Sequence, residues 1–412
     1  MIRQLVKLCW NRKRAQALVV VEVFFSFLVL FAVMAVAVYN LDNYRRPLGF
    51  DYEGVLNVNV TSLSDLAANI SGAPVSATEE SRRLLREVRG LDAVEGAAAM
   101  AVPAFDLTGM SSIVEHQGRR IDSFNNEVTD DFARVMGVEV TQGRWFEPAD
   151  DALSYDPVLI NERLKRDLFG AEDALGRNIA PKPDGTPPAG HGAGEAPREL
   201  RVVGVFTDFR EDGELSGPEP YFFRRSRIAG PDAKPYHNLV VRVRPGTPAA
   251  FEESLMNRLR AVSPGRTFQV DPLAKMRRSA MRLRLVPIVS AALIAGFMLI
   301  MVALGMVGVL WQSVARRRRE IGLRRALGAT GRGVSLQVLG ELLVVTTAGL
   351  LLAAALAVQI PLLGVIGWVS NGVYVVAMAL AALTIYGLTV VSALYPSWLA
   401  TQVQPAEALH YE

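Results

Sequence analysis

A long stretch near the C-terminus decides the fold: 342-LLVVTTAGLLLAAALAVQIPLLGVIGWVSNGVYVVAMALAALTIYGLTVVSALYPSWLA-400. No Asp, Glu, Lys or Arg occurs from Leu342 to Ala406. Because about 20 apolar residues cross the hydrocarbon core of a bilayer, this run is too long for one helix. The turn-like residues 367–372 divide it. We therefore predict one membrane span over 334–366, kinked at Pro361, and another over 373–398.

Two further uncharged runs lie upstream, from Val23 to Leu41 and from Leu285 to Trp311. They predict spans over 17–41 and 285–313, which gives four spans in a one-plus-three arrangement. Such a chain is neither wholly soluble nor held by a single anchor. The one cysteine, Cys9, excludes a disulfide framework and a thiolate zinc site.

Basic residues beside the spans predict their orientation. The N-terminal arm, 1–16, and the segment 314–333 are both basic, and four alternating helices place both in the cytoplasm. The segment 42–284 then lies outside the cytoplasm, and the tail 399–412 lies inside. Four arginines before the second span oppose this assignment, but long domains cross the membrane largely regardless of charge. They are Arg277, Arg278, Arg282 and Arg284.

A cleaved signal peptide is the alternative interpretation of the first span. Ala35-Val36-Ala37 matches a cleavage site, but the apolar stretch before it exceeds the usual length of about 7–15 residues. We therefore expect an uncleaved span.

The segment 42–284 has the mixed pattern of an α/β domain. Alternation predicts strands at 56–60 and around 241–243, and short apolar runs predict strands at 200–206 and 268–270. Helices are predicted at 79–89 and after residue 247, where Thr247 is placed to cap and Pro248 fits the first turn. The range 181–199 holds five prolines and four glycines and is interpreted as a surface loop.

Motifs for nucleotide, metal or hydrolytic chemistry do not occur in the sequence. It contains no G-x-x-x-x-G-K-[ST], H-E-x-x-H or G-x-S-x-G, and the net charge of +3 does not indicate a nucleic-acid partner. Asp208 and Asp212 are interpreted as surface turn residues rather than a site, and Trp145 and Phe146 as core. The histidines have no ligand spacing: His116, His191, His237 and His410.

Two acids fall within the spans, Glu22 and Glu341. Each is near the cytoplasmic end of its helix, so snorkelling to the interface explains it more simply than a proton or ion relay, which needs acids at mid-depth. Small residues in the spans let helices approach closely or simply face lipid. They include Gly296, Gly305, Gly308 and Gly349.

The cytoplasmic segment 315-ARRRREIGLRRALGAT-330 carries the most information about function. Glu320 and Arg324 form an i,i+4 acid–base pair on a predicted helix, Gly328 can end that helix, and Thr330 can cap the next. An anchor that binds anionic lipid is the simpler interpretation of the charge. The tight turn favours a shaped contact, because anchoring needs only charge.

The sequence 318-RREIGLRRALGA-329 resembles the cytoplasmic motif of MacB/FtsX-like ABC transporter permeases, the type VII or mechanotransmission class. Four further stretches resemble the family in the same order. These are 132-FARVMGVEVTQGRWF-146; 158-VLINE-162 with 168-LFG-170 and 174-ALGR-177; 202-VVGVFTDF-209; and 404-QPAEALHYE-412.

The resemblance implies a periplasmic domain in two parts, a porter-like part over 42–112 and 228–284 and an inserted part over 113–227. It implies a dimer, with a second copy or a related paralogue. It also implies a cytoplasmic ABC ATPase that binds ATP and Mg, so we expect no catalytic residue, cofactor or metal in this chain. A periplasmic adaptor and membrane lipid are further expected partners, and nucleic acid is not. Two departures from the family are the lack of a fused ATPase domain and the residues Ser397, Leu399 and Thr401, where basic residues are usual.

The residues implied to contact the ATPase are Arg319, Glu320, Ile321, Gly322, Arg324, Arg325, Leu327, Gly328 and Ala329. We therefore expect a multi-pass, non-catalytic permease subunit of the bacterial inner membrane with both termini in the cytoplasm. It would transmit ATP-driven motion to the periplasmic domain for export or extrusion of an envelope substrate. Lipoproteins, peptides, antibiotics and toxins remain open as cargo. The alternatives are a membrane-anchored regulator of envelope or cell-wall enzymes, and an ion-driven carrier that depends on Glu22 or Glu341.

Overall fold

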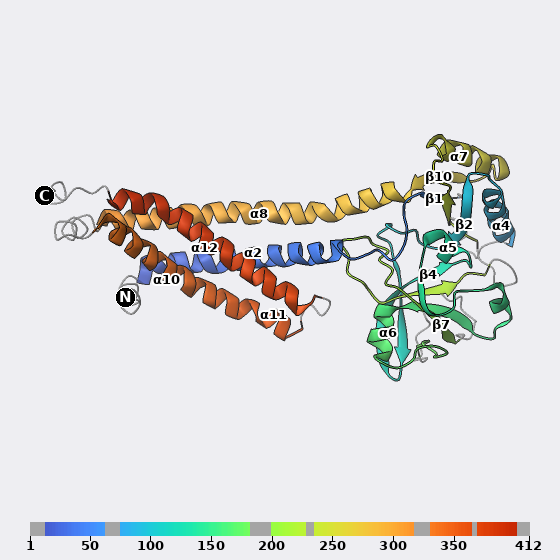
Figure 1. The fold of residues 1–412 in the computed structure, drawn as a ribbon, viewed down its shortest axis with the longest axis horizontal. Helices are drawn as coiled ribbons and strands as arrows, with labels where there is room; N and C mark the ends of the chain where they lie inside the picture. The colour runs from blue at the N-terminus through green and yellow to red at the C-terminus, as the bar shows by residue number, and fades with distance from the viewer. Residues whose placement is uncertain are drawn as a thin grey trace. The chain divides into compact units, whose positions relative to one another are not determined.

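The computed structural model describes residues 13–61, 75–181, 199–227, 235–316, 330–364 and 369–401 (Figure 1). The chain forms two compact units. One is the membrane unit, Met1–Asp42 with Leu285–Glu412, and the other is the outer domain, Asn43–Arg284.

Four long apolar helices have the length and composition of membrane spans. They are α2 (Lys13–Tyr44), α8 (Leu273–Arg316), α10 (Gly331–Ala357) and α12 (Asn371–Thr401). The predicted fold, one span before an α/β domain and three after it, is confirmed. Thr330 caps α10 as predicted, because its side chain accepts a hydrogen bond from the Gly333 amide.

Two helices differ in detail from the prediction. α8 begins at Leu273, well before its uncharged run, so its first turns belong to the outer domain. α10 ends at Ala357, and a separate short helix, α11 (Gln359–Leu362), contains Pro361. A proline inside a helix removes one backbone hydrogen bond, so a break at this position is the expected response.

The membrane unit packs through apolar side chains and small residues. Gly349 of α10 lies against Val20 and Val23 of α2, and Gly305 of α8 lies against the carboxylate of Glu22. These two glycines allow close helix approach as predicted, whereas Gly296 and Gly308 face open space among the described residues.

Two polar contacts join α10 to α12, which pack side by side in Figure 1. The hydroxyls of Thr346 and Thr389 lie 3.3 Å apart, and those of Thr347 and Tyr386 lie 2.9 Å apart. Hydrogen bonds of this kind hold helices together where no water competes for them.

The outer domain contains one mixed sheet in the order β10-β1-β9-β2-β4-β8-β6-β7-β5, with β3 paired to β4. The strands are β1 (Val55–Thr61), β2 (Val94–Met100), β3 (Met110–His116), β4 (Arg119–Val128), β5 (Val140–Gly143), β6 (Asp156–Asn161), β7 (Leu200–Phe206), β8 (Tyr221–Arg225), β9 (Asn238–Val243) and β10 (Thr267–Pro272). The predicted strand 200–206 is β7, with the same bounds. The strands predicted at 56–60, 241–243 and 268–270 fall in β1, β9 and β10.

Short helices cover this sheet. They are α4 (Val75–Arg89), α5 (Phe132–Met136), the 3-10 helix η1 (Pro148–Ala152), α6 (Glu162–Phe169) and α7 (Ala250–Val262). Thr247 does not cap α7. Its hydroxyl donates to the carbonyl of Arg244, and the helix begins at Ala250 with Ala249 at the cap. Thr247 lies in the turn before the helix, too early to reach its first free amides.

The sheet has two halves that meet at a narrow seam. β2 and β4 share the single pair Met100↔Val128, with β10, β1 and β9 on one side and the remaining strands on the other. The predicted division at 112/113 falls inside β3, which pairs along its whole length with β4. Because the described pairing of β3 is with β4 along the whole strand, all of β3 lies in the second half of the sheet.

Candidate functional site

The residues predicted to contact an ATPase lie outside the described residues. All of them, from Arg319 to Ala329, fall between the end of α8 and the start of α10. Much of the predicted surface loop 181–199 also lies outside the described ranges.

The described structure instead brings together the two segments of the outer domain that lead to the membrane spans. The loop Phe209–Glu219, which we call the clamp loop, follows strand β7 and contacts both. One segment is Arg46 and Pro47, just after α2, and the other is the first turns of α8. All these residues belong to the outer domain.

Arg210 holds the clamp loop to the first segment. Its side chain is 3% exposed, and its guanidinium donates to the carbonyls of Arg46 at 2.9 Å and Pro47 at 3.3 Å. The same group donates to carbonyls within the loop, at Ser216 and Glu214. A buried cation is tolerated only when its donors are satisfied, and guanidinium supplies five of them in one plane. Arg210 therefore fixes the shape of the loop and its contact with the chain entering from α2.

Two arginines of α8 join the other side of the clamp loop. Arg284 pairs with Asp212 at 2.6 Å and donates to the hydroxyl of Ser216. Arg277 pairs with Glu214 and lies over the ring of Tyr52, 4.7 Å from its centroid. Two of the four arginines that oppose the charge rule are thus neutralised within the domain that carries them.

Glu211 is the buried acid of the clamp loop. Its side chain is 7% exposed and accepts a hydrogen bond from the Asn126 amide at 3.2 Å, while its backbone carbonyl accepts one from Phe105. Burial raises the pKa of Glu211 to about 8, and the negative charge of Asp212 adds to the effect. The carboxyl is therefore mostly protonated at neutral pH.

The aspartates that flank Phe209 have structural roles. Asp208 accepts from the backbone amide of Arg163 at 2.9 Å and from the side chain of Asn161 at 3.2 Å, so it holds the start of α6. Asp212 holds the clamp loop to α8 through its ion pair with Arg284. Arg210 and Glu211 themselves did not stand out in the sequence, where two charged residues after a strand are typical of an exposed turn.

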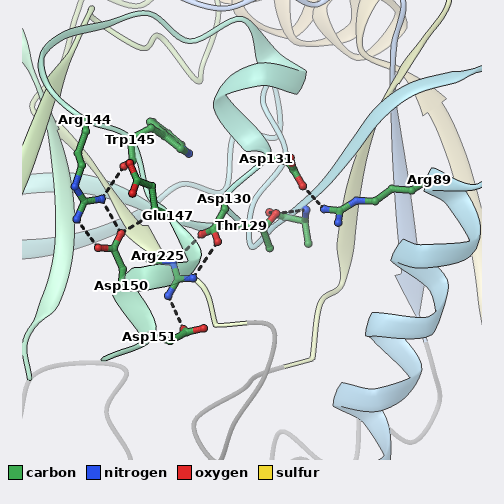
Figure 2. A network of polar contacts seen from close by, with 11 residues as sticks. Arg89, Thr129, Asp130, Asp131, Arg144, Trp145, Glu147, Asp150, Asp151 and Arg225 are labelled. Atoms are coloured by element: carbon green, nitrogen blue, oxygen red, sulfur yellow. Dashed lines mark hydrogen bonds and ion pairs between the residues drawn. The ribbon is translucent and has the colours of Figure 1, made fainter. Parts of the chain in front are cut away.

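A second polar network supports the inserted half of the domain (Figure 2). Arg225 joins Asp130 at 2.7 Å to Asp151 at 2.6 Å, and Arg144 pairs with the buried Asp150 of η1 at 2.5 Å. Hydrogen bonding to Arg144 and to the Glu147 amide outweighs burial and lowers the pKa of Asp150. Both arginines and all three aspartates have an opposite partner, so we interpret the network as structural.

Trp145 and Phe146 pack in the core as predicted. Phe146 is buried, and Trp145 stacks on Phe132 and meets Phe223 edge to face. The two membrane acids have different described contacts: Glu22 lies against Gly305, and Glu341 accepts from Gln337 one turn away at 3.4 Å.

These features define a membrane protein with four apolar helices and an extracytoplasmic α/β domain between the first two. The MacB-like periplasmic core domain matches residues 24–258, and the FtsX-like permease C-terminal domain matches residues 292–405. The chain belongs to the MacB/FtsX-like family of ABC transporter permeases.

Similar proteins include a "Macrolide export ATP-binding/permease protein MacB" from Bdellovibrio bacteriovorus, 28% identical over 284 residues, which cover 66% of this chain and 41% of that protein. The "Uncharacterized ABC transporter permease YvrN" of Bacillus subtilis is 27% identical over 303 residues, covering 69% of each. The crystal structure of the periplasmic region of MacB from Actinobacillus actinomycetemcomitans matches 56% of this chain and 94% of that one, with 14% identity and a TM-score of 0.37. The chain therefore spans less than half the length of the Bdellovibrio MacB protein.

Proposed function

We propose that this chain is the permease subunit of an ABC transporter complex, and that it transmits motion of a separate ATPase to the outer domain. The observation that carries the proposal is the clamp loop. The clamp loop contacts both segments that lead to membrane spans, and it connects strands β7 and β8 of the sheet. A relative displacement of the two segments therefore acts on the loop and, through it, on these strands. Family membership supports the same assignment.

In this proposal the segment Arg319–Ala329 receives the movement. ATP and Mg bind to the partner ATPase, and this chain supplies no catalytic group. The permease works as a dimer, with a second copy or a paralogue, and both termini lie in the cytoplasm. A periplasmic adaptor completes the path, and the cargo is an envelope substrate for which the relatives' names make macrolides one candidate.

The apolar character of the spans favours a mechanism in which the helices transmit force. It does not favour one in which a solute passes through the membrane between them. Within the described spans the acids are Glu22, Glu341 and Asp42. Asp42 lies at the last turn of α2, and Glu22 and Glu341 each have a local contact in the protein. An ion-driven carrier needs acids that line a continuous route at mid-depth.

The test is co-purification with a separate ABC ATPase from the same organism, followed by measurement of nucleotide hydrolysis. Leu327→Asp with Gly328→Asp is expected to abolish both co-purification and permease-dependent stimulation, because two charges enter a tight contact. Leu363→Asp with Gly364→Asp is the matched control. It changes a second Leu-Gly pair to two aspartates, but this pair follows α11, beyond the other end of α10. Normal assembly and coupling in the first variant would refute the proposed contact.

A hydrolysis-deficient ATPase separates transport from regulation. Export is expected to stop when the ATPase cannot hydrolyse ATP. Full activity of the complex under that condition would instead identify the chain as a regulator of envelope enzymes.

A further inference from the structure

The carboxyl group of Glu22 lies deeper along the spans than its place in the sequence indicates. Its two oxygens lie 2.5 and 2.6 Å from the point where a Cβ on Gly305 of α8 would stand. Gly305 is six residues before Trp311, the last residue of the uncharged run of that helix. At a rise of about 1.5 Å per residue, the carboxyl group lies about 9 Å inside the run and does not reach its end.

Helix α10 gives a second measure of this depth. Gly349 lies against Val20 and Val23, which are on either side of Glu22 in α2. Gly349 is seven residues after Leu342, where the uncharged run of α10 begins, so this level is about 10 Å inside that run. All three helices belong to the membrane unit. Because the hydrocarbon core is about 30 Å thick, both measures place Glu22 about a third of the way across it.

Among the described residues, no cation reaches this carboxyl group. Glu22 makes no hydrogen bond and no ion pair with any of them. On α8 the nearest charged residue is Arg316, eleven residues beyond Gly305. On α10 the nearest is an acid, Glu341, and α12 has no charged residue. On α2 the nearest base is Arg14, about two helical turns before Glu22.

The exposed side chains around the site are apolar. Leu18 and Phe25, one turn before and one turn after Glu22, are 66% and 56% exposed. On α8, Met301 and Leu304 are 50% and 62% exposed. Lipid chains would cover this face with hydrocarbon, and a second copy that met it through the same face would add the same apolar side chains. In both cases water is excluded, and an unpaired carboxylate is far less stable there than a neutral carboxyl group.

We propose that Glu22 is a proton-binding site within the membrane unit, and that its neutral carboxyl group joins α2 to α8. The carboxylate takes one proton from water, and the resulting carboxyl group fills the space beside Gly305. Only glycine leaves that space open, because a Cβ would stand 2.5 Å from the nearer carboxyl oxygen. Loss of the proton puts an unpaired charge between two packed helices and favours their separation. The contact between α2 and α8 therefore depends on pH.

The experiment uses the full-length chain in phosphatidylcholine nanodiscs and dicyclohexylcarbodiimide, an apolar reagent that adds to a protonated carboxyl group. Mass spectrometry of the peptides measures labelling at each acid between pH 6 and pH 10. Glu22 is expected to be labelled at pH 7 and to lose that labelling as the pH rises toward 10. A water-soluble carbodiimide is expected to label the exposed Glu253 of α7 and to leave Glu22 unlabelled.

Two glycine variants test the space that holds the carboxyl group. Gly305→Ala puts a methyl group in that space and is expected to remove most of the labelling at pH 7, because the displaced group turns toward water and ionises. Gly308→Ala is the matched control and is expected to keep the labelling, since its methyl group meets open space among the described residues.

Glu22→Gln measures the packing of the helices separately from the labelling. Its side chain stays neutral at every pH, so its thermal midpoint is expected to exceed that of the unmodified chain by an amount that grows from pH 7 to pH 10. A difference that stays constant over this range would contradict the proposed dependence on pH.

Three labelling results would also overturn the proposal. The first is no labelling of Glu22 at pH 7, which identifies an ionised group that is either free or paired with a cation of another chain. The second is equal labelling by the water-soluble reagent, which places the carboxyl group at the aqueous interface. The third is equal labelling of Gly305→Ala and Gly308→Ala. None of these measurements involves an ATPase, so the proposed function can fail while this inference stands.

Discussion

The buried carboxyl of Glu211 predicts how the stability of the outer domain depends on pH. Its pKa is raised from 4.5 to about 8 because the side chain is buried in the clamp loop. A group that holds its proton more tightly in the folded protein stabilises the fold below its unfolded pKa, and that contribution is lost as pH rises through the folded pKa. The window for Glu211 is therefore pH 4.5 to about 8.

The shift sets the size of the effect. At about 1.4 kcal/mol for each pKa unit, moving from 4.5 to about 8 corresponds to roughly 5 kcal/mol of unfolding free energy, as an upper limit. Glu211→Gln keeps the oxygen that accepts from Asn126 and carries no charge at any pH. The variant is expected to match the unmodified chain near pH 4.5 and to be more stable by several kcal/mol above pH 8.

Pulse proteolysis in urea measures this on the full-length chain in detergent at pH 5, 7 and 9. Glu253→Gln, at an exposed position of α7, is the matched control and is expected to show no such divergence with pH. A constant difference between Glu211→Gln and the unmodified chain across this range would refute the reasoning. So would a difference that grows toward acid pH.

Three further substitutions test other contacts. Arg210→Met leaves several buried carbonyls without a donor and is expected to destabilise the outer domain by about 3–5 kcal/mol, with faster hydrogen exchange at residues 43–50 as the measured sign. Asn161→Ala removes the oxygen that accepts from the amides of Leu164 and Tyr221, and a loss of about 3 kcal/mol is expected in pulse proteolysis. Gly349→Ala pushes a methyl group against α2 and is expected to cost about 1–3 kcal/mol in thermal unfolding, whereas Gly296→Ala, in open space, is expected to change little. Unchanged exchange in Arg210→Met, an unchanged midpoint in Asn161→Ala, or equal effects of the two glycine variants would count against the respective contacts.

Local patterns predicted elements well where a single property decides them. The absence of charge located the four spans, because a charge in the bilayer is expensive whatever the tertiary fold. Strand β7 and the Thr330 cap were also predicted, since each depends on residues next to one another in the chain. Thr247 was assigned the wrong role because two adjacent turns offered its hydroxyl different partners.

The clamp loop was missed for a physical reason. Arg210 is buried against carbonyls more than 160 residues away in the chain, and Glu211 contacts Asn126 of strand β4, 85 residues away. From sequence alone, two adjacent charged residues after a strand are expected to be exposed, because burying a charge without partners is costly. Hydrogen-bond partners from distant parts of the chain allow Arg210 and Glu211 to be buried instead.

The amino-acid sequence by itself determined that this protein crosses the membrane four times and carries a mixed domain after the first span, because hydrophobic length and periodicity are local properties. Tertiary structure alone decided which arginines beside the second span are neutralised and which stay exposed. It also decided that one loop joins both segments leading to the spans. Those outcomes depend on contacts between distant parts of the chain, and no local pattern records them.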